Sequence, residues 1–346
     1  MFEGTSAQAI NKTLDCLLER PEVVCFGLGV NDPKGVFETT SGLADKHGDL
    51  RVFEPPTSEN GFMGMAVGMA AAGLRPIVVH QRVEFALLAL DPIVNQAAKW
   101  RYMTGGRATC PVVTRLVVGR GWGQGPQHSQ SLESWFIHIP GLRVYAPTTP
   151  YQYTQCLNEA TDSPQPSIIF EHRWTHGVMG SVDIDTNASH SDTRATYFPG
   201  PDATLLSYSN GSRDALNLRD VLMREHGISI GVLAFNRLDN ITGNEILSQI
   251  PSEKPVVIID QSWEKCGVGS WVASMLVDSS PSIGSKLTVL SPMFTPFAST
   301  RGVVDQVYIS QEKIASALRN LGLQIPSDVT FKPTRDTPDS SAFGPF

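Results

Sequence analysis

Short apolar stretches of strand length alternate with segments of helical periodicity through most of this chain. In the first half, strands are predicted at residues 23–28, 51–53, 76–79, 111–118, 143–146 and 167–171, and helices at 6–18, 61–74, 91–102, 132–138 and 149–161. This alternation predicts an α/β fold with a mainly parallel, doubly wound sheet that carries helices on both faces. Ligands of such sheets gather at the carboxyl ends of the strands, so functional residues are expected in the segments that follow them.

The alternation breaks between about residues 175 and 203, where Asp, Asn, Ser, His, Gly and Pro replace the periodic pattern. Beyond the break, strands are predicted at 204–207, 229–235, 255–260 and 286–290, with helices at 213–225, 244–250, 269–277 and 311–321. A chain of 346 residues with 41% hydrophobic content can bury two cores. We therefore predict a first domain over 1–180, a linker over 181–202, a second, smaller α/β C-terminal domain over 203–325 and a polar, Pro-rich tail over 326–346.

Charge and cysteine content exclude several classes of function. The net charge is −7 and no cluster of Lys and Arg occurs, which disfavours a nucleic-acid partner. The five cysteines lie far apart, without the spacing of a zinc site, and are expected to be reduced thiols of a cytoplasmic protein. No signal peptide is indicated, and the longest apolar run, residues 61–74, is too short to span a bilayer. We expect a soluble protein with no membrane partner.

One acidic residue, Glu59, stands just before a helix of small and flexible side chains. Gly61, Gly64 and Gly68 each cost helix stability, so their repetition indicates the close approach of another helix backbone. Glu59 would then be held where two packed surfaces meet. On the residues alone, the alternative is that Glu59 caps the helix, since acidic side chains are common near a first turn.

Three stretches together resemble a known family: residues 58–61, 95–103 and 119–131, the last of which reads Gly-Arg-Gly-Trp-Gly-Gln-Gly-Pro-Gln-His-Ser-Gln-Ser. They are similar to the β subunit of the thiamine-diphosphate-dependent 2-oxo-acid dehydrogenases, such as pyruvate dehydrogenase, within the transketolase-like enzymes. The similarity runs in order from about residue 5 to about residue 321 and is strongest between residues 51 and 171. It implies a subunit of an oxidoreductase or transferase that binds thiamine diphosphate and acts on a 2-oxo acid.

The resemblance implies roles for three residues. Glu59 matches the glutamate that hydrogen-bonds the aminopyrimidine ring nitrogen, which lets the exocyclic nitrogen take the thiazolium proton. Phe85 matches the position whose ring packs on the pyrimidine, although an aromatic residue in an apolar stretch is equally expected in a core. His128 matches the active-site histidine that hydrogen-bonds the substrate carboxylate or the developing oxyanion, whereas most loop histidines are simply solvated.

The metal and the second half of the cofactor site are expected on another chain. Superfamily members that bind the diphosphate carry Gly-Asp-Gly followed later by Asn-Asn to hold Mg²⁺, and no Gly-Asp-Gly occurs here. The resemblance therefore implies an α subunit that supplies Mg²⁺ and the diphosphate site, in an α₂β₂ heterotetramer. Asp162 matches a region where some relatives bind potassium, but a turn-forming Asp close to Pro is the interpretation we favour.

Several positions depart from the family pattern. Arg82 and Glu84 are more charged than is common, and either could face the substrate or the other. Residues 171–176, Glu-His-Arg-Trp-Thr-His, differ from the shorter, less aromatic segment usual in the dehydrogenases and could reshape the substrate pocket. Residues 263–271 and 295–300 lack the acidic residues common in relatives, where this domain helps to dock the acyltransferase core, so that partner stays open.

Two alternatives to a dehydrogenase subunit therefore remain. The first is a stand-alone, transketolase-like thiamine-dependent pair that makes or transfers carbon–carbon bonds in sugar or secondary metabolism. The second is a non-catalytic regulatory subunit, which the presence of both Glu59 and His128 disfavours. The sequence does not specify the 2-oxo acid or the acceptor.

Overall fold

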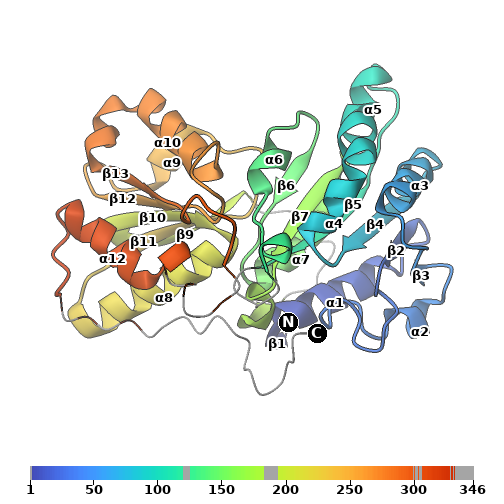
Figure 1. Ribbon diagram of the computed structural model, residues 1–346, viewed down its shortest axis with the longest axis horizontal. Helices are drawn as coiled ribbons and strands as arrows, with labels where there is room; N and C mark the ends of the chain where they lie inside the picture. Colours follow the sequence, from blue (N-terminus) through green and yellow to red (C-terminus); the bar gives the residue numbers. More distant parts are fainter. Residues whose placement is uncertain are drawn as a thin grey trace. The chain divides into compact units, whose positions relative to one another are not determined.

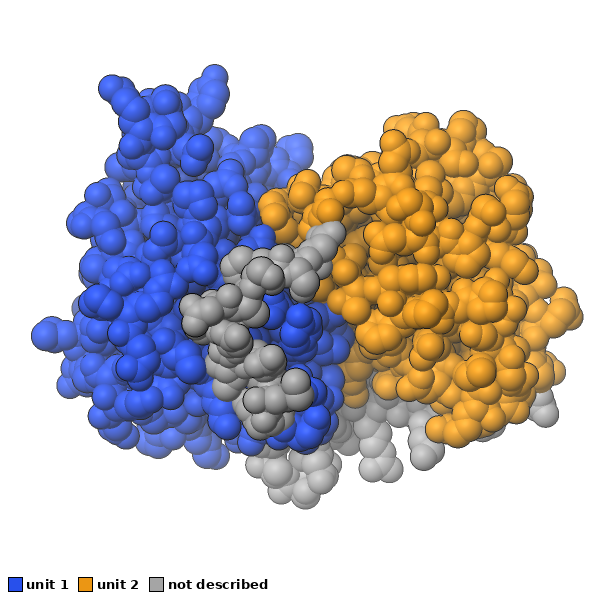
Figure 2. Space-filling view, turned by 180° about the vertical axis from the view of Figure 1, so that it is seen from behind, with its two compact units in different colours: residues 1–118, 135–193 blue, residues 119–134, 194–346 orange. Residues whose placement is uncertain are grey.

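The computed structural model divides into two compact units (Figures 1 and 2). The described residues are 2–119, 125–182, 194–298, 300, 303, 306–327, 329 and 331. The first unit comprises residues 1–118 and 135–193, and the second comprises 119–134 and 194–346. Most of the predicted linker, residues 183–193, and most of the predicted tail, residues 332–346, lie outside the described ranges, so the predicted domain boundaries stay predictions.

A six-stranded sheet, parallel throughout, forms the centre of the first unit (Figure 1). Its strands, in spatial order, are β3 (Val52–Phe53), β2 (Val23–Gly27), β4 (Arg75–His80), β5 (Val113–Val118), β7 (Ser167–His172) and β6 (Arg143–Tyr145). The residues of β2, β5 and β7 are all buried, as expected of parallel strands covered on both faces. The doubly wound parallel sheet predicted from the alternating pattern is confirmed.

Two helices of the first unit begin directly after a capping threonine. The helices of this unit are α1 (Ser6–Leu17), α2 (Leu43–His47), α3 (Glu59–Ala71), α4 (Val83–Ala86), α5 (Ala98–Met103) and α7 (Pro150–Asp162), with 3₁₀ turns at Leu87–Ala89 and Thr175–Gly177. The 3₁₀ turn Pro126–His128 lies in the second unit, and α6 (Glu133–Ile137) begins in the second unit and ends in the first. Thr5 caps α1 and Thr149 caps α7, each in a reciprocal capping box with a glutamine three residues later. Helices α1 and α7 are linked by a hydrogen bond of 3.1 Å between the hydroxyl groups of Thr13 and Thr154.

Two features of the first unit differ from the sequence-based prediction. The helix predicted at residues 91–102 begins as a π-helical segment, Asp91–Ala97, before α5. The Asp91 carboxylate accepts hydrogen bonds from the side chains of Asn95 and Gln96, four and five residues later, which accompanies the wider turn. In addition, β1 (Phe2–Thr5) pairs antiparallel with β8 (Met179–Val182), a two-stranded sheet that the periodic pattern does not reveal.

The second unit contains a five-stranded sheet that is parallel except for one edge strand. Its strands, in spatial order, are β13 (Leu287–Leu290), β12 (Val256–Ile259), β10 (Ala203–Tyr208), β11 (Ile230–Phe235) and β9 (Ala195–Pro201), and its helices are α8 (Ser209–His226), α9 (Gly243–Gln249), α10 (Val268–Ser279) and α12 (Gln311–Asn320), with a 3₁₀ segment at Pro281–Lys286. A buried core that includes Leu205, Val232, Leu218 and Ile314 lies between this sheet and α8 and α12. The predicted second α/β domain is thus confirmed as a fold.

Strand β9 corrects one detail, because residues 195–201 were assigned to the linker. The strand pairs antiparallel with β11 at the sheet edge, and six of its seven residues are partly or fully exposed, Gly200 being the exception. An edge strand buried on neither face does not need alternating apolar residues, so the sequence gives no strand pattern here. Among the described residues, no helix combines the length and apolar character needed to cross a membrane.

Candidate cofactor-binding site

The carboxyl edge of the first sheet has a topological switch point at β2. The connection after β2 runs to β3 on one side, whereas the connection after its neighbour β4 runs to β5 on the other side, so the chain leaves these two strand ends in opposite directions. Doubly wound sheets bind ligands in the crevice that such a reversal creates. The segments that follow β2, β3 and β4 carry Phe37, Glu59, Arg82 and Phe85, which makes this edge the candidate site.

Glu59 is the first residue of α3, and its side chain is almost buried, with 8% of its surface exposed. Within the described ranges, the carboxylate of Glu59 has no hydrogen-bond or ion-pair partner, and the preceding residue, Ser58, makes no side-chain cap. A carboxylate in a nearly water-free position costs free energy unless a donor reaches it. A ligand that presents a hydrogen-bond donor would offset this cost, and the role of Glu59 stays a prediction.

Phe85 lies in the short helix α4 and is half-buried, so its ring is not a fully enclosed core residue. A residue that sequence reasoning missed is His80, the last residue of β4. It is 2% exposed, and burial lowers its pKa to about 3, so it is neutral at pH 7. Its ring lies 5.3 Å from that of Phe62 in α3, which links the end of β4 to the helix that begins with Glu59.

His128 ends the 3₁₀ turn Pro126–His128 and is half-buried. The Ser129 hydroxyl closes this turn by donating a 2.9 Å hydrogen bond to the carbonyl of Gly125. Residues 119–134 belong to the second unit, whereas Glu59 and Phe85 belong to the first. That His128 shares a site with them stays a prediction.

An ion pair behind the carboxyl edge joins β5 to β7. Arg115 and Glu171 are both fully buried, with Nε–Oε1 and Nη2–Oε2 distances of 2.5 and 2.9 Å. Burial alone would raise the pKa of Glu171, but the guanidinium of Arg115 overrides it and holds that pKa at about 2. His176 Nε2 lies 3.4 Å from the same carboxylate, and Arg115 also donates a 2.9 Å hydrogen bond to the Thr39 hydroxyl. This pair fixes the loop after β2 against the sheet.

Two acidic residues, Asp260 and Glu133, are buried in the second unit. The carboxylate of Asp260, the residue after β12, accepts hydrogen bonds from the Tyr208 hydroxyl at 2.6 Å and from the Gly269 N–H at 2.7 Å. Glu133 is also fully buried, and its carboxylate accepts a 2.6 Å hydrogen bond from Ser131. Burial raises the pKa of Glu133 to about 7 against that hydrogen bond, and the nearby charge of Asp260 adds to the rise.

Comparison with known proteins decides the family. Residues 4–176 match the model of the pyrimidine-binding domain of transketolase. The chain is 32% identical over 323 residues to the β subunit of acetoin:2,6-dichlorophenolindophenol oxidoreductase of Cupriavidus necator, covering 90% of this chain and 95% of the relative. It is 30% identical to the pyruvate dehydrogenase E1 component subunit β of Chaetosphaeridium globosum, covering 93% and 99%.

The chain belongs to the β-subunit family of the thiamine-diphosphate-dependent 2-oxo-acid dehydrogenases. A solved structure, described as an inactive β₄ tetramer of a split-gene transketolase, shares the fold with a TM-score of 0.74 at 21% identity and covers 92% of this chain and 99% of its own. The resemblance stated from the sequence is therefore confirmed. The roles of Glu59, Phe85 and His128 are not tested by these comparisons.

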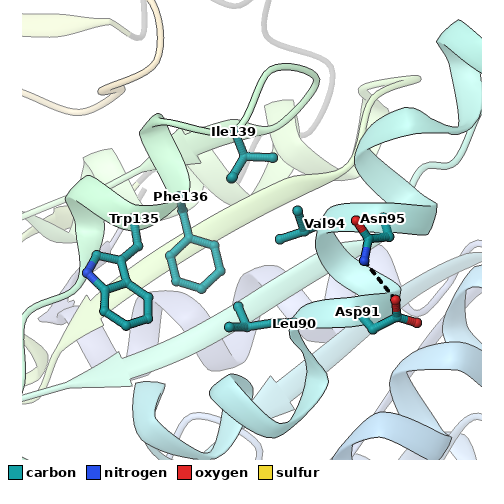
Figure 3. A pocket seen from close by; sticks show the side chains of 7 residues that line it. All are labelled: Leu90, Asp91, Val94, Asn95, Trp135, Phe136 and Ile139. Carbon is teal, nitrogen blue, oxygen red and sulfur yellow. Dashed lines mark hydrogen bonds between the residues drawn. The ribbon is translucent and has the colours of Figure 1, made fainter.

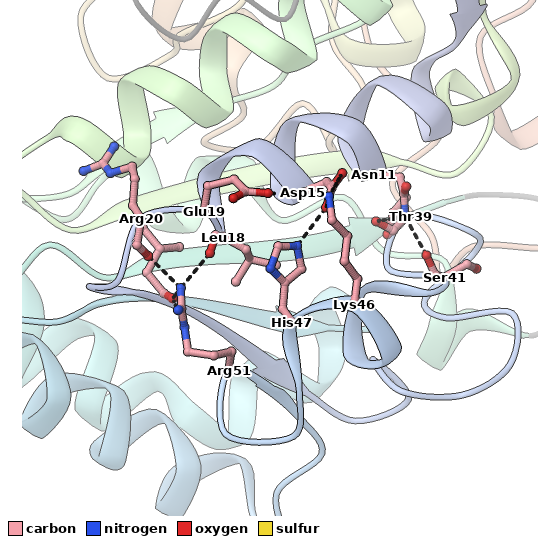
Figure 4. Close-up of polar contacts among 11 residues, drawn as sticks. Asn11, Asp15, Leu18, Glu19, Arg20, Thr39, Ser41, Lys46, His47 and Arg51 are labelled. Carbon is pink, nitrogen blue, oxygen red and sulfur yellow. Dashed lines mark hydrogen bonds and ion pairs between the residues drawn. The ribbon is translucent and has the colours of Figure 1, made fainter.

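One group of side chains among the described residues of this β subunit has the spacing to hold a cation, and Asp162 is the predicted potassium candidate. Asp15, Glu19 and His47 lie together, but the ammonium of Lys46 is 2.6 and 2.7 Å from the two oxygens of Asp15 and supplies the positive charge (Figure 4). At the potassium candidate, the Asp162 carboxylate lies 2.7 Å from Nη1 of Arg20.

The backbone carbonyl groups on either side of Asp162 also contact an arginine. Arg75 Nη1 donates hydrogen bonds to the carbonyl oxygens of Thr161 and Ser163 on either side of Asp162. Arginines therefore meet the oxygen atoms that a potassium ion would need. Asp162 is the last residue of α7, and potassium binding stays untested.

One cavity of about 330 Å³ opens on the first unit (Figure 3). Its lining residues are Leu90, Asp91, Val94, Asn95, Trp135, Phe136 and Ile139. The one charged group, Asp91, is engaged by Asn95 at 2.8 Å. The cavity therefore offers apolar surface and no group suited to proton transfer.

Proposed function

We propose that this chain is the β subunit of a thiamine-diphosphate-dependent enzyme that acts on 2-oxo acids, and that Glu59 binds the pyrimidine half of the cofactor. The observation that carries the proposal is the nearly buried carboxylate of Glu59, which has no partner among the described residues and stands at the switch point of a pyrimidine-binding fold. Phe85 is proposed to pack against the pyrimidine.

When bound, thiamine diphosphate supplies the carbon nucleophile and the electron sink of the reaction. Glu59 would share one proton with the pyrimidine ring nitrogen, in a hydrogen bond between that nitrogen and its carboxyl group. Its burial excludes water, which strengthens that hydrogen bond. His128 is proposed to donate a hydrogen bond to the substrate carboxylate or to the oxygen that gains charge during decarboxylation. Acyl or aldehyde transfer to an acceptor then follows.

An α subunit is proposed to complete the site with Mg²⁺ and the diphosphate-binding residues, in an α₂β₂ assembly. Two features support it: the sequence has no Gly-Asp-Gly, and the relatives are themselves named as subunits. In addition, a methyl group added at Gly64 or Gly68 of α3 would meet no atom of the described residues within 4 Å. The close helix approach predicted from these glycines is therefore absent within the described part of the chain, and we assign it to a partner.

The test is Glu59→Gln in the assembly with the α subunit. Glutamine keeps the shape but cannot hold the shared proton, so exchange of the thiazolium proton, followed by NMR, should slow by about 10²–10⁴-fold. Glu54→Gln, at an exposed acid five residues earlier, is the matched control and should exchange at the parent rate. Unchanged exchange in Glu59→Gln would reject the assignment.

The alternative of a thiamine-dependent pair that forms carbon–carbon bonds uses the same Glu59 and differs in the acceptor. The altered residues 263–271 and 295–300, in the domain expected to dock an acyltransferase, favour this alternative. Product analysis of the assembly with a lipoyl acceptor and with an aldehyde acceptor separates the two. A cytoplasmic location stays a prediction.

A further inference from the structure

The C-terminal end of α7 attracts positive charge that the helix itself does not provide. Its last turn, residues 159–162, contains no basic residue, and the last helical residue, Asp162, carries a carboxylate. Carbonyl groups at the C-terminal end of a helix add partial negative charge because they have no partner within the helix. A cation is therefore expected here, either from another segment of the chain or from solvent.

Arg75 provides one cation from the first sheet. Its Nη1 donates hydrogen bonds to the carbonyl oxygens of Thr161 and Ser163, the second at 3.3 Å. Thr161 and Ser163 are 0% and 3% exposed, so little water reaches these two residues. Backbone carbonyl oxygens are also the ligands that a potassium ion takes in proteins. One nitrogen atom thus bridges two oxygens that could otherwise coordinate an ion.

The backbone of Arg75 is fixed by the sheet. Arg75 is the first residue of β4 and lies opposite Val23 in the parallel pairing of β4 with β2. Its N–H donates a 2.7 Å hydrogen bond to the carbonyl of Glu22, the residue before β2. A planar guanidinium group presented from a paired strand loses little conformational entropy when it bonds the turn. All of these residues, and the turn itself, belong to the first unit.

Arg20 provides a second positive charge at the same turn. Its Nη1 lies 2.7 Å from Oδ1 of Asp162, and its Nη2 lies 2.9 Å from Oε1 of Glu22. The side chains of Arg20 and Asp162 are 34% and 42% exposed, so solvent and salt weaken this ion pair. We therefore expect the bonds from Arg75 to the carbonyl groups of two buried residues to contribute more to the stability of the turn.

A guanidinium group and a bound ion exclude each other at this turn. An ion that coordinated the carbonyl oxygens of Thr161 and Ser163 would lie next to Nη1 of Arg75. Two positive charges about 4 Å apart near a protein surface repel strongly enough to weaken binding about a thousandfold. The turn therefore does not fit a resident potassium ion while Arg75 is in place.

We propose that Arg75 and Arg20 take the place of a potassium ion at the turn after α7, so that the first unit keeps this turn folded without a bound metal. Their guanidinium groups meet the carbonyl and carboxylate oxygens that an ion would otherwise neutralise. The inference concerns the fold and does not rest on the proposed thiamine role. It also states what removal of Arg75 does, because a turn without that guanidinium group depends on a cation from solvent.

The test measures hydrogen exchange of the full chain by mass spectrometry, in peptides that cover residues 150–166. The protection of these amides reports the free energy of local opening. Exchange is compared in potassium chloride and in N-methyl-D-glucamine chloride at the same ionic strength, so that the screening of charges is equal. The parent chain should be protected equally in both salts. Higher protection of the parent chain in potassium chloride would overturn the proposal.

Arg75→Met keeps an apolar stem and removes the charged donor. In N-methyl-D-glucamine chloride, its local opening at α7 should become about ten- to a hundredfold more favourable, as expected for lost hydrogen bonds to a charged group. Potassium should reverse this loss by a factor that grows with its concentration, because the ion binds only the folded turn. Arg101→Met, at an exposed arginine of α5, is the matched control and should exchange like the parent in both salts. The proposal is wrong if Arg75→Met is as protected as the parent chain, or if its protection ignores potassium.

A second measurement on the parent chain applies if Arg75→Met does not fold, as judged by circular dichroism. Equilibrium dialysis uses radioactive rubidium, an ion that occupies potassium sites, at an ionic strength high enough to screen the net charge of the chain. Equal rubidium concentrations on both sides of the membrane support the proposal. Rubidium that the parent chain retains and that Asp162→Asn releases would show an ion at the turn and reject the proposal.

Discussion

Replacing Gly68 by a larger residue should stabilise the isolated chain but disrupt the proposed assembly. It lies in the interior of α3, is exposed, and adopts an ordinary helical backbone. A Cβ atom built there meets nothing within 4 Å among the described residues. Glycine in a helix interior is about 0.8–1 kcal/mol less favourable than alanine, and leucine is close to alanine. Gly68→Leu should therefore raise the free energy of unfolding of the isolated chain by about 1 kcal/mol, measured by urea denaturation.

The same substitution should abolish assembly if α3 packs backbone to backbone on a partner helix. A leucine side chain adds four carbon atoms where the partner backbone is expected, and such overpacking typically costs about 1–3 kcal/mol per contact. We expect Gly68→Leu to elute as free β subunit when it is coexpressed with the α subunit, under conditions in which the parent chain copurifies with it. Sedimentation velocity gives the stoichiometry of each species.

Ser316→Leu is the matched control, since Ser316 is an exposed helical residue of α12 in the second unit. It adds the same side chain and should leave assembly intact. The reasoning is refuted if Gly68→Leu is at least as stable as the parent chain and still assembles normally, because α3 then contacts no partner. A loss of stability in the isolated chain would show that the face of α3 is not open.

Three further predictions follow from the site. His128→Ala should leave thiazolium proton exchange intact but lower turnover by about 10²–10³-fold, and failure already at exchange would place His128 in cofactor binding instead. The isolated chain should bind thiamine diphosphate with Mg²⁺ only weakly in calorimetry, and tight binding without a partner would refute the divided site. The pKa of Glu133 is raised from its ordinary value of 4.5 to about 7 in the folded state, so between these two pH values the folded state keeps a proton that the unfolded state has lost. The free energy of unfolding should therefore fall as the pH rises from 4.5 to 7. Glu133→Gln keeps an acceptor for the Ser131 hydroxyl and should remove this pH dependence. In denaturation experiments above pH 7, the free energy of unfolding should rise by on the order of 3 kcal/mol. An unchanged dependence of that free energy on pH would mean that Glu133 titrates normally.

The parallel sheet and its helices could be predicted because their pattern is local. Strands such as β12 are buried along their whole length and consist of an uninterrupted apolar run, and capping residues such as Thr149 mark helix starts in the sequence itself. Glu59 could be singled out for a similar reason, since it directly precedes a helix of unusual composition. The edge strand β9 and the pairing of β1 with β8 were missed because neither strand needs a buried, alternating face.

The remaining site residues could not be predicted because they depend on contacts between distant segments. Phe37 stands in a loop rich in Gly, Asn, Asp and Pro, and only its positive φ and its two arginine neighbours, Arg82 and Arg173, single it out. Arg115 and Glu171 are 56 positions apart, and the residue pattern of neither strand predicts that they pair. Such contacts depend on how distant segments come together in the fold, so no periodic pattern in the sequence predicts them.

The pair formed by Arg115 and Glu171 also limits how this protein can diversify. Replacing one member leaves an unpaired charge in the interior, at a cost of about 3–5 kcal/mol, which is a large share of the free energy of unfolding of an ordinary domain. A double replacement by apolar residues could be tolerated, but it would release the loop that presents Phe37 through Thr39. Any set of variants that aims at new substrates should therefore keep Arg115 and Glu171 constant, because the loop after β2 depends on their pairing.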